Sequence, residues 1–271
     1  MTEIDLSRPQ KSPERGLQAG LARVAAILAF IALWEVAAVY VADPIWIGRP
    51  SAVMVRLWAL LQSGELARDA SFTIYHALAG LALSFVVGVP VGLLFGSYTA
   101  IASTFDTLLL GFYSLPRVAL APLFILWFGI GEFSKIMMTF SMVVFVVILN
   151  TYEGLRGIDP DLVDMMRAMR ARPSYILRKV RLPTIVPWLT ASARVGIGLA
   201  LVGSVIGELL GANRGLGWYI EYSAARLDIT GVFAGLMVLM IVGMALNEAV
   251  RLIDNTVWRK RTGTTTAGAR S

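Results

Sequence analysis

The chain has 271 residues, of which 57% are hydrophobic and only 15% are charged, and its mean hydropathy is +0.70. Soluble domains carry about 25% charged residues, so the composition excludes an ordinary soluble protein, and it is too apolar for a disordered one. Cysteine is absent and histidine occurs once, which argues against disulfides, a cysteine nucleophile and a zinc site. The net charge of +6 comes from basic residues scattered between apolar runs, so no nucleic-acid partner is expected.

Six apolar runs follow a polar segment at residues 1–23. Each is close to the length of about 20 residues that a helix needs to cross a bilayer core of about 30 Å. The first run is too long for a signal-peptide core, so we expect it to be a retained anchor. The sequence therefore predicts an all-α, polytopic membrane protein with six transmembrane helices, at residues 24–41, 72–96, 104–128, 136–152, 184–210 and 231–253.

The distribution of basic residues predicts the orientation of these spans. With a cytosolic amino terminus, 16 Lys and Arg residues lie on the inner side and six on the outer side. An excess of this kind marks the cytosolic face, so both termini are predicted to be cytosolic. One transmembrane domain then covers residues 24–258, with a cytosolic loop at 153–183 and a flexible tail at 259–271.

A short helix is predicted between the first two spans, on the outer surface. Pro50 and Ser51 are typical of a helix start. Apolar residues then recur at helical spacing, at Val53, Leu57, Leu60 and Leu61.

The cytosolic loop contains a predicted amphipathic helix. Asp159 can cap it and Pro160 can occupy its first position. One face is an apolar ridge, and the opposite face carries Arg167 and Arg170; the ridge comprises Leu162, Met165, Met166 and Met169. Methionine side chains adapt to irregular grooves, which favours docking to another protein, whereas the arginines equally suit contact with anionic lipid.

A second short helix is predicted after the first. Pro173 breaks the first helix, Ser174 can cap the next one, and Leu182 and Pro183 are expected to end it. Two short helices joined by a sharp turn would form a projection outside the membrane.

Several spaced motifs resemble the inner-membrane permease subunit of binding-protein-dependent ABC importers, in particular its nitrate, sulfonate and taurine group. The stretch 164–183 stands in the place of the family's EAA loop, although Asp164-Met165-Met166 replaces Glu-Ala-Ala and Arg170 replaces the turn glycine. Arginine enters left-handed backbone space less freely than glycine, which leaves the geometry of this turn open. The other motifs are Glu153-Gly154-Leu155, Gly207-Glu208, Gly215-Leu216-Gly217, Pro116, Ala119, Leu120, Pro122, the run 127–131 and Ser134-Lys135.

The resemblance implies a type I ABC importer permease in the bacterial inner membrane. It implies a homodimer of this chain, a dimer of cytosolic ABC ATPase subunits and an extracytoplasmic solute-binding protein as partners. The chain contains no GxxxxGK[ST] phosphate loop, so ATP and Mg²⁺ would be bound by the partner, and this chain would be neither an enzyme nor a cofactor protein. The residues that would contact the ATPase are Asp164, Met165, Met166, Met169, Arg170 and Tyr175.

Four polar residues in or near the spans are candidates for the translocation path. Arg117 and Arg194 lie near mid-bilayer by helical rise, so they must face inward. They either line an anion path or pair with carboxylates such as Glu35 or Asp106. His76 either packs as a polar residue within the bundle or lines the path. Glu208 resembles the family's glutamate before its Gly-Leu-Gly turn, and we expect it to act as a gate or a loop anchor.

Glycines and prolines predict how the spans pack. Two glycine ridges repeat every four residues and would pack within one subunit or form the dimer seam. The prolines at 90, 116, 122 and 187 should bend or interrupt helices, and segment 116–122 is the best candidate for a broken helix. The ridges are Gly88, Gly92 and Gly96, and Gly203, Gly207 and Gly211.

A small anion is the expected substrate. A secondary transporter remains the alternative, although the sequence has no convincing inverted repeat. An integral-membrane enzyme would require clustered histidines or carboxylates, which the single histidine disfavours.

Overall fold

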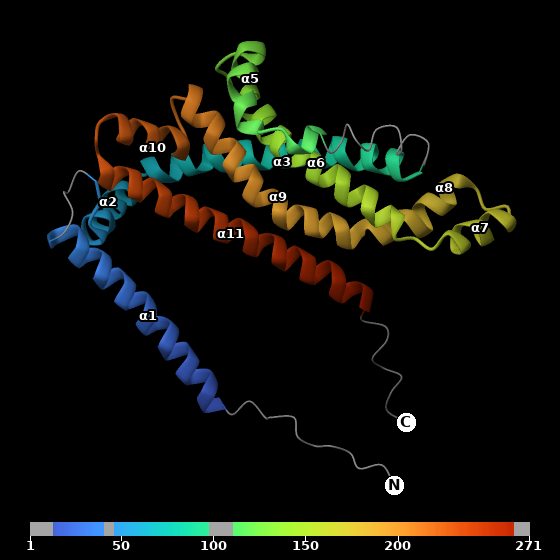
Figure 1. Ribbon diagram of the computed structural model, residues 1–271, viewed down its shortest axis with the longest axis horizontal. Helices are drawn as coiled ribbons and strands as arrows, with labels where there is room; N and C mark the ends of the chain where they lie inside the picture. Colours follow the sequence, from blue (N-terminus) through green and yellow to red (C-terminus); the bar gives the residue numbers. More distant parts are fainter. Residues whose placement is uncertain (1–12, 41–45, 98–110, 263–271) are drawn as a thin grey trace, which may run out of the picture.

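The computed structural model describes residues 13–40, 46–97 and 111–262, and within them all regular secondary structure is helical (Figure 1). Asp106, the first part of the third predicted span and the tail beyond residue 262 lie outside the described residues. The elements are α1 (Pro13–Tyr40), α2 (Pro50–Ser63), α3 (Glu65–Ser97), η1 (Arg117–Leu120), α5 (Ala121–Phe128), α6 (Glu132–Arg156), α7 (Pro160–Ala168), α8 (Pro173–Ile176), η2 (Leu177–Arg181), α9 (Leu182–Gly211), α10 (Leu216–Ala225) and α11 (Ile229–Thr262).

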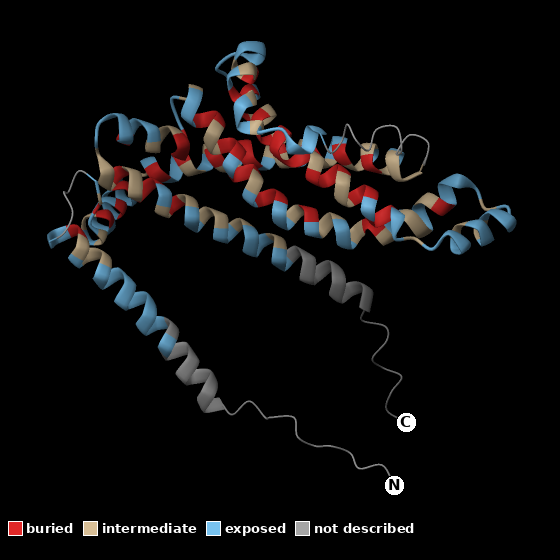
Figure 2. Ribbon diagram, in the orientation of Figure 1, coloured by how far each residue is buried: buried red, intermediate tan, exposed pale blue. Residues whose placement is uncertain are grey.

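Helix α6 forms the centre of an elongated bundle, between α3 and α9 (Figure 1). Figure 2 shows that the buried residues concentrate where these three helices face one another, whereas α1 is largely exposed. The elbow formed by α7 and α8 lies at one end of the bundle, and α2 and α10 lie at the other (Figure 1).

The glycine ridge of α3 packs against α6 inside the chain. A Cβ atom at Gly92 would lie 2.5 Å from the Cβ of Thr151, so only glycine allows the helices to approach this closely. Along the ridge, Gly88 meets Val147, Gly92 meets Thr151 and Gly96 meets Leu155. The difference in residue number is the same in each pair, so the two helices run parallel.

The ridge of α9 packs on another side of α6, and here the helices run antiparallel. A Cβ atom at Gly203 would lie 2.7 Å from the Cα of Thr139, and one at Gly207 would lie 3.0 Å from the Cα of Lys135. Because these neighbours are backbone atoms, no side-chain rotation could make room. Of the two uses that the sequence left open, packing within one subunit is the one that the structure shows for both ridges.

Four of the described helices are long and apolar enough to cross a membrane: α3, α6, the continuous helix Pro173–Gly211, and α11 over Ile229–Leu252. Two shorter apolar stretches, Val24–Tyr40 and Arg117–Phe128, coincide with the first and third predicted spans. The all-helical class is therefore as predicted, and four of the six predicted spans are formed by helices long enough to cross a membrane.

The third predicted span is broken at Pro116, as its prolines predicted. Helical residues 111–114 give way to the 3₁₀ turn η1 and then to α5. Arg117 links the broken segment to α6, because its guanidinium donates to the carbonyl oxygen of Met142 on α6 at 3.1 Å. It also donates to the carbonyl oxygen of Tyr113, on the other side of the break, at 3.1 Å. The guanidinium also lies 5.2 Å from the ring centroids of Tyr113 and Phe145. By contrast, Pro90 and Pro187 were expected to bend or interrupt their helices, and neither interrupts its helix: α3 and α9 continue through them.

Helix α2 forms as predicted and is attached to α1 and α11. Its apolar face is buried, although Leu61 proves to be exposed. Glu35, predicted as a partner for the intramembrane arginines, instead accepts hydrogen bonds from the backbone N–H (3.0 Å) and the hydroxyl (2.7 Å) of Ser51. The carboxylate thereby satisfies a free amide at the positive amino terminus of α2. Arg56 of α2 forms an ion pair with Asp228, next to α11.

Candidate functional site

The elbow, residues 159–181, begins as the sequence predicted. Asp159 caps α7 by accepting a hydrogen bond of 2.9 Å from the N–H of Asp161, and Pro160 is the first helical residue. The predicted apolar ridge projects from the bundle: Leu162, Met165 and Met169 are exposed, and Met166 is half-buried. Asp164 forms an exposed ion pair with Arg167 at 3.0 Å.

The turn of the elbow retains a left-handed residue although glycine is absent. Arg170 has φ +60°, and its N–H donates to the carbonyl of Arg167 at 2.8 Å. The N–H of Ala171 donates to the carbonyl of Met166 at 3.0 Å. These two bonds form the Schellman motif that ends helices, usually with glycine in the left-handed position. Arg170 therefore adopts the glycine-type geometry at a steric cost of about 1–2 kcal/mol.

The second half of the elbow differs from the prediction. Arg172 occupies the N-cap of α8 without a side-chain bond, so Ser174 lies inside the helix and does not cap it. The helix also does not stop at Pro183, because α8 continues through η2 into α9. Proline clashes with the carbonyl four residues earlier in a regular α-helix, and η2 is a π-helical turn, whose wider winding relieves that clash.

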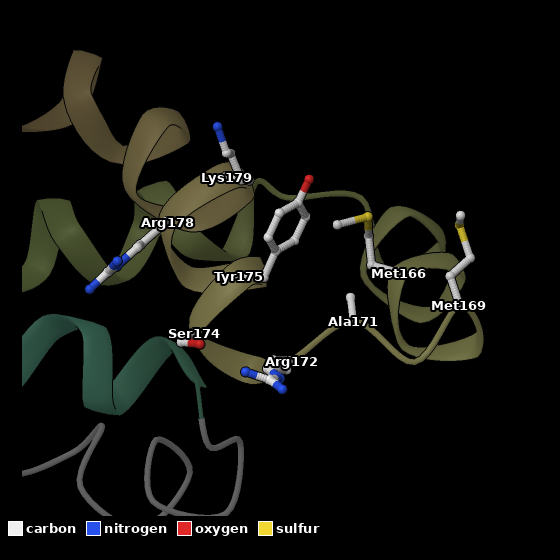
Figure 3. A pocket seen from close by; sticks show the side chains of 8 residues that line it. All are labelled: Met166, Met169, Ala171, Arg172, Ser174, Tyr175, Arg178 and Lys179. Carbon is white, nitrogen blue, oxygen red and sulfur yellow. The ribbon is translucent and has the colours of Figure 1, made fainter.

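A groove of about 600 Å³ lies between the two halves of the elbow (Figure 3). Met166 from α7 and Tyr175 from α8 point toward the same space, so the groove has an apolar centre (Figure 3). Three cations also contribute to its lining. The residues around it are Met166, Met169, Ala171, Arg172, Ser174, Tyr175, Arg178 and Lys179.

A buried polar cluster lies at the opposite end of the bundle, around Glu208. Its Oε1 lies 3.0 Å from His76 Nδ1 and accepts from the Ser204 hydroxyl at 3.3 Å. Its Oε2 accepts from the Thr73 hydroxyl at 2.8 Å and from the N–H of Gly217 at 2.9 Å. His76 and Glu208 are 2% and 1% exposed, so the structure joins two of the four predicted path residues in one buried pair.

The cluster holds the amino terminus of α10. Successive N–H groups of Gly215, Leu216 and Gly217 donate to Asp69, Thr73 and Glu208 respectively, at 3.1, 2.9 and 2.9 Å. These amides have no partner within α10 itself, so the side chains satisfy them. A Cβ atom at Gly215, whose φ is +110°, would lie 2.4 Å from the Glu208 carboxyl carbon. The loop therefore needs glycine at this position to lie over the carboxylate.

Several members of this cluster are not among the residues predicted from the sequence. Asp69 and Thr73 precede His76 on α3 by seven and three residues, and Ser204 precedes Glu208 by four residues on α9. Polar residues repeated along one face of an apolar helix were the available signal. Lys135, read only as part of a family motif, is 6% exposed beside this cluster.

The remaining path candidates lie elsewhere. Arg117 is half-buried at the broken span, bound to carbonyls and aromatic rings. Arg194 lies on an exposed face of α9. On this helix Arg194 lies 14 residues before Glu208, which is about 21 Å at 1.5 Å per residue, so the four candidates do not form one site.

Comparison with known proteins places the chain in a family. Residues 88–259 match the family described as "Binding-protein-dependent transport system inner membrane component". The chain belongs to this family. That match spans the elbow, the glycine ridge of α9 and the part of the polar cluster that lies on α9 and the following loop, whereas Asp69, Thr73 and His76 precede it.

Individual relatives are named for the transport of different solutes. A Bacillus subtilis permease protein named for aliphatic sulfonate transport is 32% identical over 232 residues, covering 84% of each chain. The formylaminopyrimidine transport permease protein of Halalkalibacterium halodurans is 29% identical over 86% of this chain and 94% of its own. A structure of the MetNI methionine ABC transporter in an inward-facing conformation matches with a TM-score of 0.60 and 24% identity, over 80% of this chain and 99% of that chain. The permease is therefore a multi-pass inner-membrane component of an ABC transporter.

Proposed function

We propose that this permease imports a small anionic solute by alternating access, driven by a separate ABC ATPase that binds the elbow. The family and the names of its relatives support the transport role. In this proposal the complete transporter also contains an ATPase dimer, a solute-binding protein and a second copy of the permease. The permease itself has six spans and cytosolic termini.

One structural observation carries the mechanism. The helix that begins in the elbow at Pro173 runs without interruption to Gly211, over 39 residues, and so reaches Glu208. At 1.5 Å per residue it is about 58 Å long. A continuous helix transmits a displacement along its length, so a movement of the elbow changes the position of Glu208 and the loop bound to it.

The elbow has the chemistry of a docking surface. Met165 and Met169 are 54% and 73% exposed, and Tyr175 is 51% exposed. Aromatic and methionine side chains are enriched in protein interfaces. When ATP binding draws the two elbows of a dimer together, the translocation cavity between the spans would open outward to receive the solute. When the elbows separate after ATP hydrolysis, this cavity would open inward again.

Affinity purification of the permease from its native membranes tests the proposal. An ABC ATPase subunit should copurify, as identified by mass spectrometry and by ATP hydrolysis in the eluate. Replacing both Met165 and Met166 with Asp should abolish copurification without preventing membrane insertion. Leu227→Asp is the matched control, because Leu227 is 77% exposed at the opposite end of the bundle.

Two results would refute the proposal. Full retention of the ATPase by the double Asp variant would show that the ATPase binds elsewhere. Accumulation of solute against a gradient by vesicles that contain this chain alone would instead identify a secondary transporter.

A further inference from the structure

A small hollow beside the polar cluster has no role in the mechanism above. It measures about 230 Å³ and lies where α3, α6 and the loop between α9 and α10 meet. Pockets for drug-sized ligands measure about 300–1,000 Å³, so this one suits a smaller molecule. Its lining comprises Phe72, His76, Glu132, Lys135, Ala212, Asn213 and Arg214.

Two cations and one carboxylate give the lining an excess of one positive charge. Arg214 lies on the loop, with its guanidinium carbon 5.6 Å from the centre of the Phe72 ring. Lys135 donates to the carbonyls of Ile130 and Gly131, at 2.9 and 3.2 Å. An ammonium group has three N–H donors, so one remains for a ligand.

His76 provides an independent observation. His76 Nδ1 is hydrogen-bonded to Glu208, so Nε2 is the ring nitrogen that is left for another partner. Among the described residues, Nε2 is buried without a hydrogen-bond partner. A buried polar atom left without a partner costs about 1–3 kcal/mol. His76 also lines the adjoining hollow, so this ring lies next to a molecule bound there.

We propose that this hollow binds a small monoanionic oxyacid, a carboxylate or sulfonate of a few heavy atoms. The acid oxygens accept from Arg214 and Lys135, and the single positive excess of the lining matches one negative charge.

The position of the hollow gives the bound anion a role in transport. Arg214 directly precedes Gly215, whose N–H is held by Asp69. An anion on Arg214 therefore contacts the same loop that Glu208 anchors, and both lie at the far end of the helix that starts in the elbow. This site would receive the solute before translocation, and the inference thus rests on the proposed function.

Chemical modification of arginine tests the site in the intact chain. The purified permease in lipid nanodiscs is treated with phenylglyoxal, and modification of individual arginines is followed by peptide mass spectrometry. Methanesulfonate and acetate are the probes, with methylammonium as the cationic control. We expect either anion to slow modification of Arg214 at least fivefold and methylammonium to have no effect.

Arg226 provides a matched internal control. It is also exposed and also lies over an aromatic ring, 4.9 Å from the centre of Tyr222, but it does not line the hollow. Its modification rate should not change with either anion. Equal protection of both arginines, or protection of neither, would overturn the proposal.

Direct binding to variants provides a second measurement. In calorimetry, Arg214→Gln should weaken methanesulfonate binding at least tenfold, and Arg226→Gln should leave it unchanged. Unchanged binding to folded Arg214→Gln would also overturn the inference. Copurification of the ATPase is a separate outcome: if it persists while no anion binds, only the hollow is wrong, whereas its loss refutes the proposed function.

Discussion

Adding one methyl group at Gly203 should separate α9 from α6. The new Cβ would lie 2.7 Å from the Cα and 3.2 Å from the backbone nitrogen of Thr139. Ordinary contacts of a Cβ atom begin near 3.4 Å. Because the obstruction is backbone, the two helices must move apart. Overpacking of this kind typically costs about 1–3 kcal/mol.

Gly198→Ala is the matched control for Gly203→Ala. Gly198 lies in the same helix, but a Cβ atom there has no neighbour within 4 Å among the described residues. Both substitutions gain the same helix propensity, about 1 kcal/mol, so the difference between them isolates the steric cost. That cost should appear as a melting temperature roughly 2–10 °C lower for Gly203→Ala.

Thermal unfolding of the two variants in the same detergent measures this difference. Size-exclusion chromatography should accompany it, so that a change in oligomeric state at the exposed Gly198 is recognised. Equal melting temperatures for the two variants at the same oligomeric state would refute the packing of α9 on α6 through Gly203.

Three further substitutions test the elbow and the polar cluster. Arg170→Gly should relieve the left-handed strain by a net amount of about 1 kcal/mol, so the Ala171 amide should exchange hydrogen about fivefold more slowly; faster exchange would contradict the Schellman turn. Asp159→Ala should remove the cap of α7 at a cost of about 1 kcal/mol and reduce retention of the ATPase, whereas Asp159→Asn should restore it; a failure of Asn to do so would argue against capping. Glu208→Ala should destabilise the protein by about 3–5 kcal/mol, because buried donors lose their acceptor; an unchanged melting temperature would show that the cluster is not closed in solution.

Local features of the chain were predictable from its sequence. The cap of α7 at Asp159 involves residues two positions apart, and the methionine ridge depends only on helical spacing. The break at Pro116 likewise follows from the covalent geometry of proline. The spans depend on composition over about 20 residues, which the sequence displays directly.

Proline alone did not decide where helices end. Pro183 was expected to stop the second helix of the elbow, and the structure instead accommodates it behind the π-helical turn η2. Arg170 similarly adopts the conformation expected of glycine. At Pro183 the continuation of the helix outweighs a local preference of about 3 kcal/mol. At Arg170 the two hydrogen bonds of the Schellman motif offset a steric cost of about 1–2 kcal/mol.

The sequence by itself determined that this chain is helical, lies in a membrane and presents an apolar elbow, because these properties arise from residues close together in the chain. Only the tertiary structure decided that His76 meets Glu208, since the two are 132 positions apart. The same holds for Lys135 and Arg214, whose shared hollow exists only where three elements converge. Burial of polar groups requires partners, and the fold alone determines which residues those partners are.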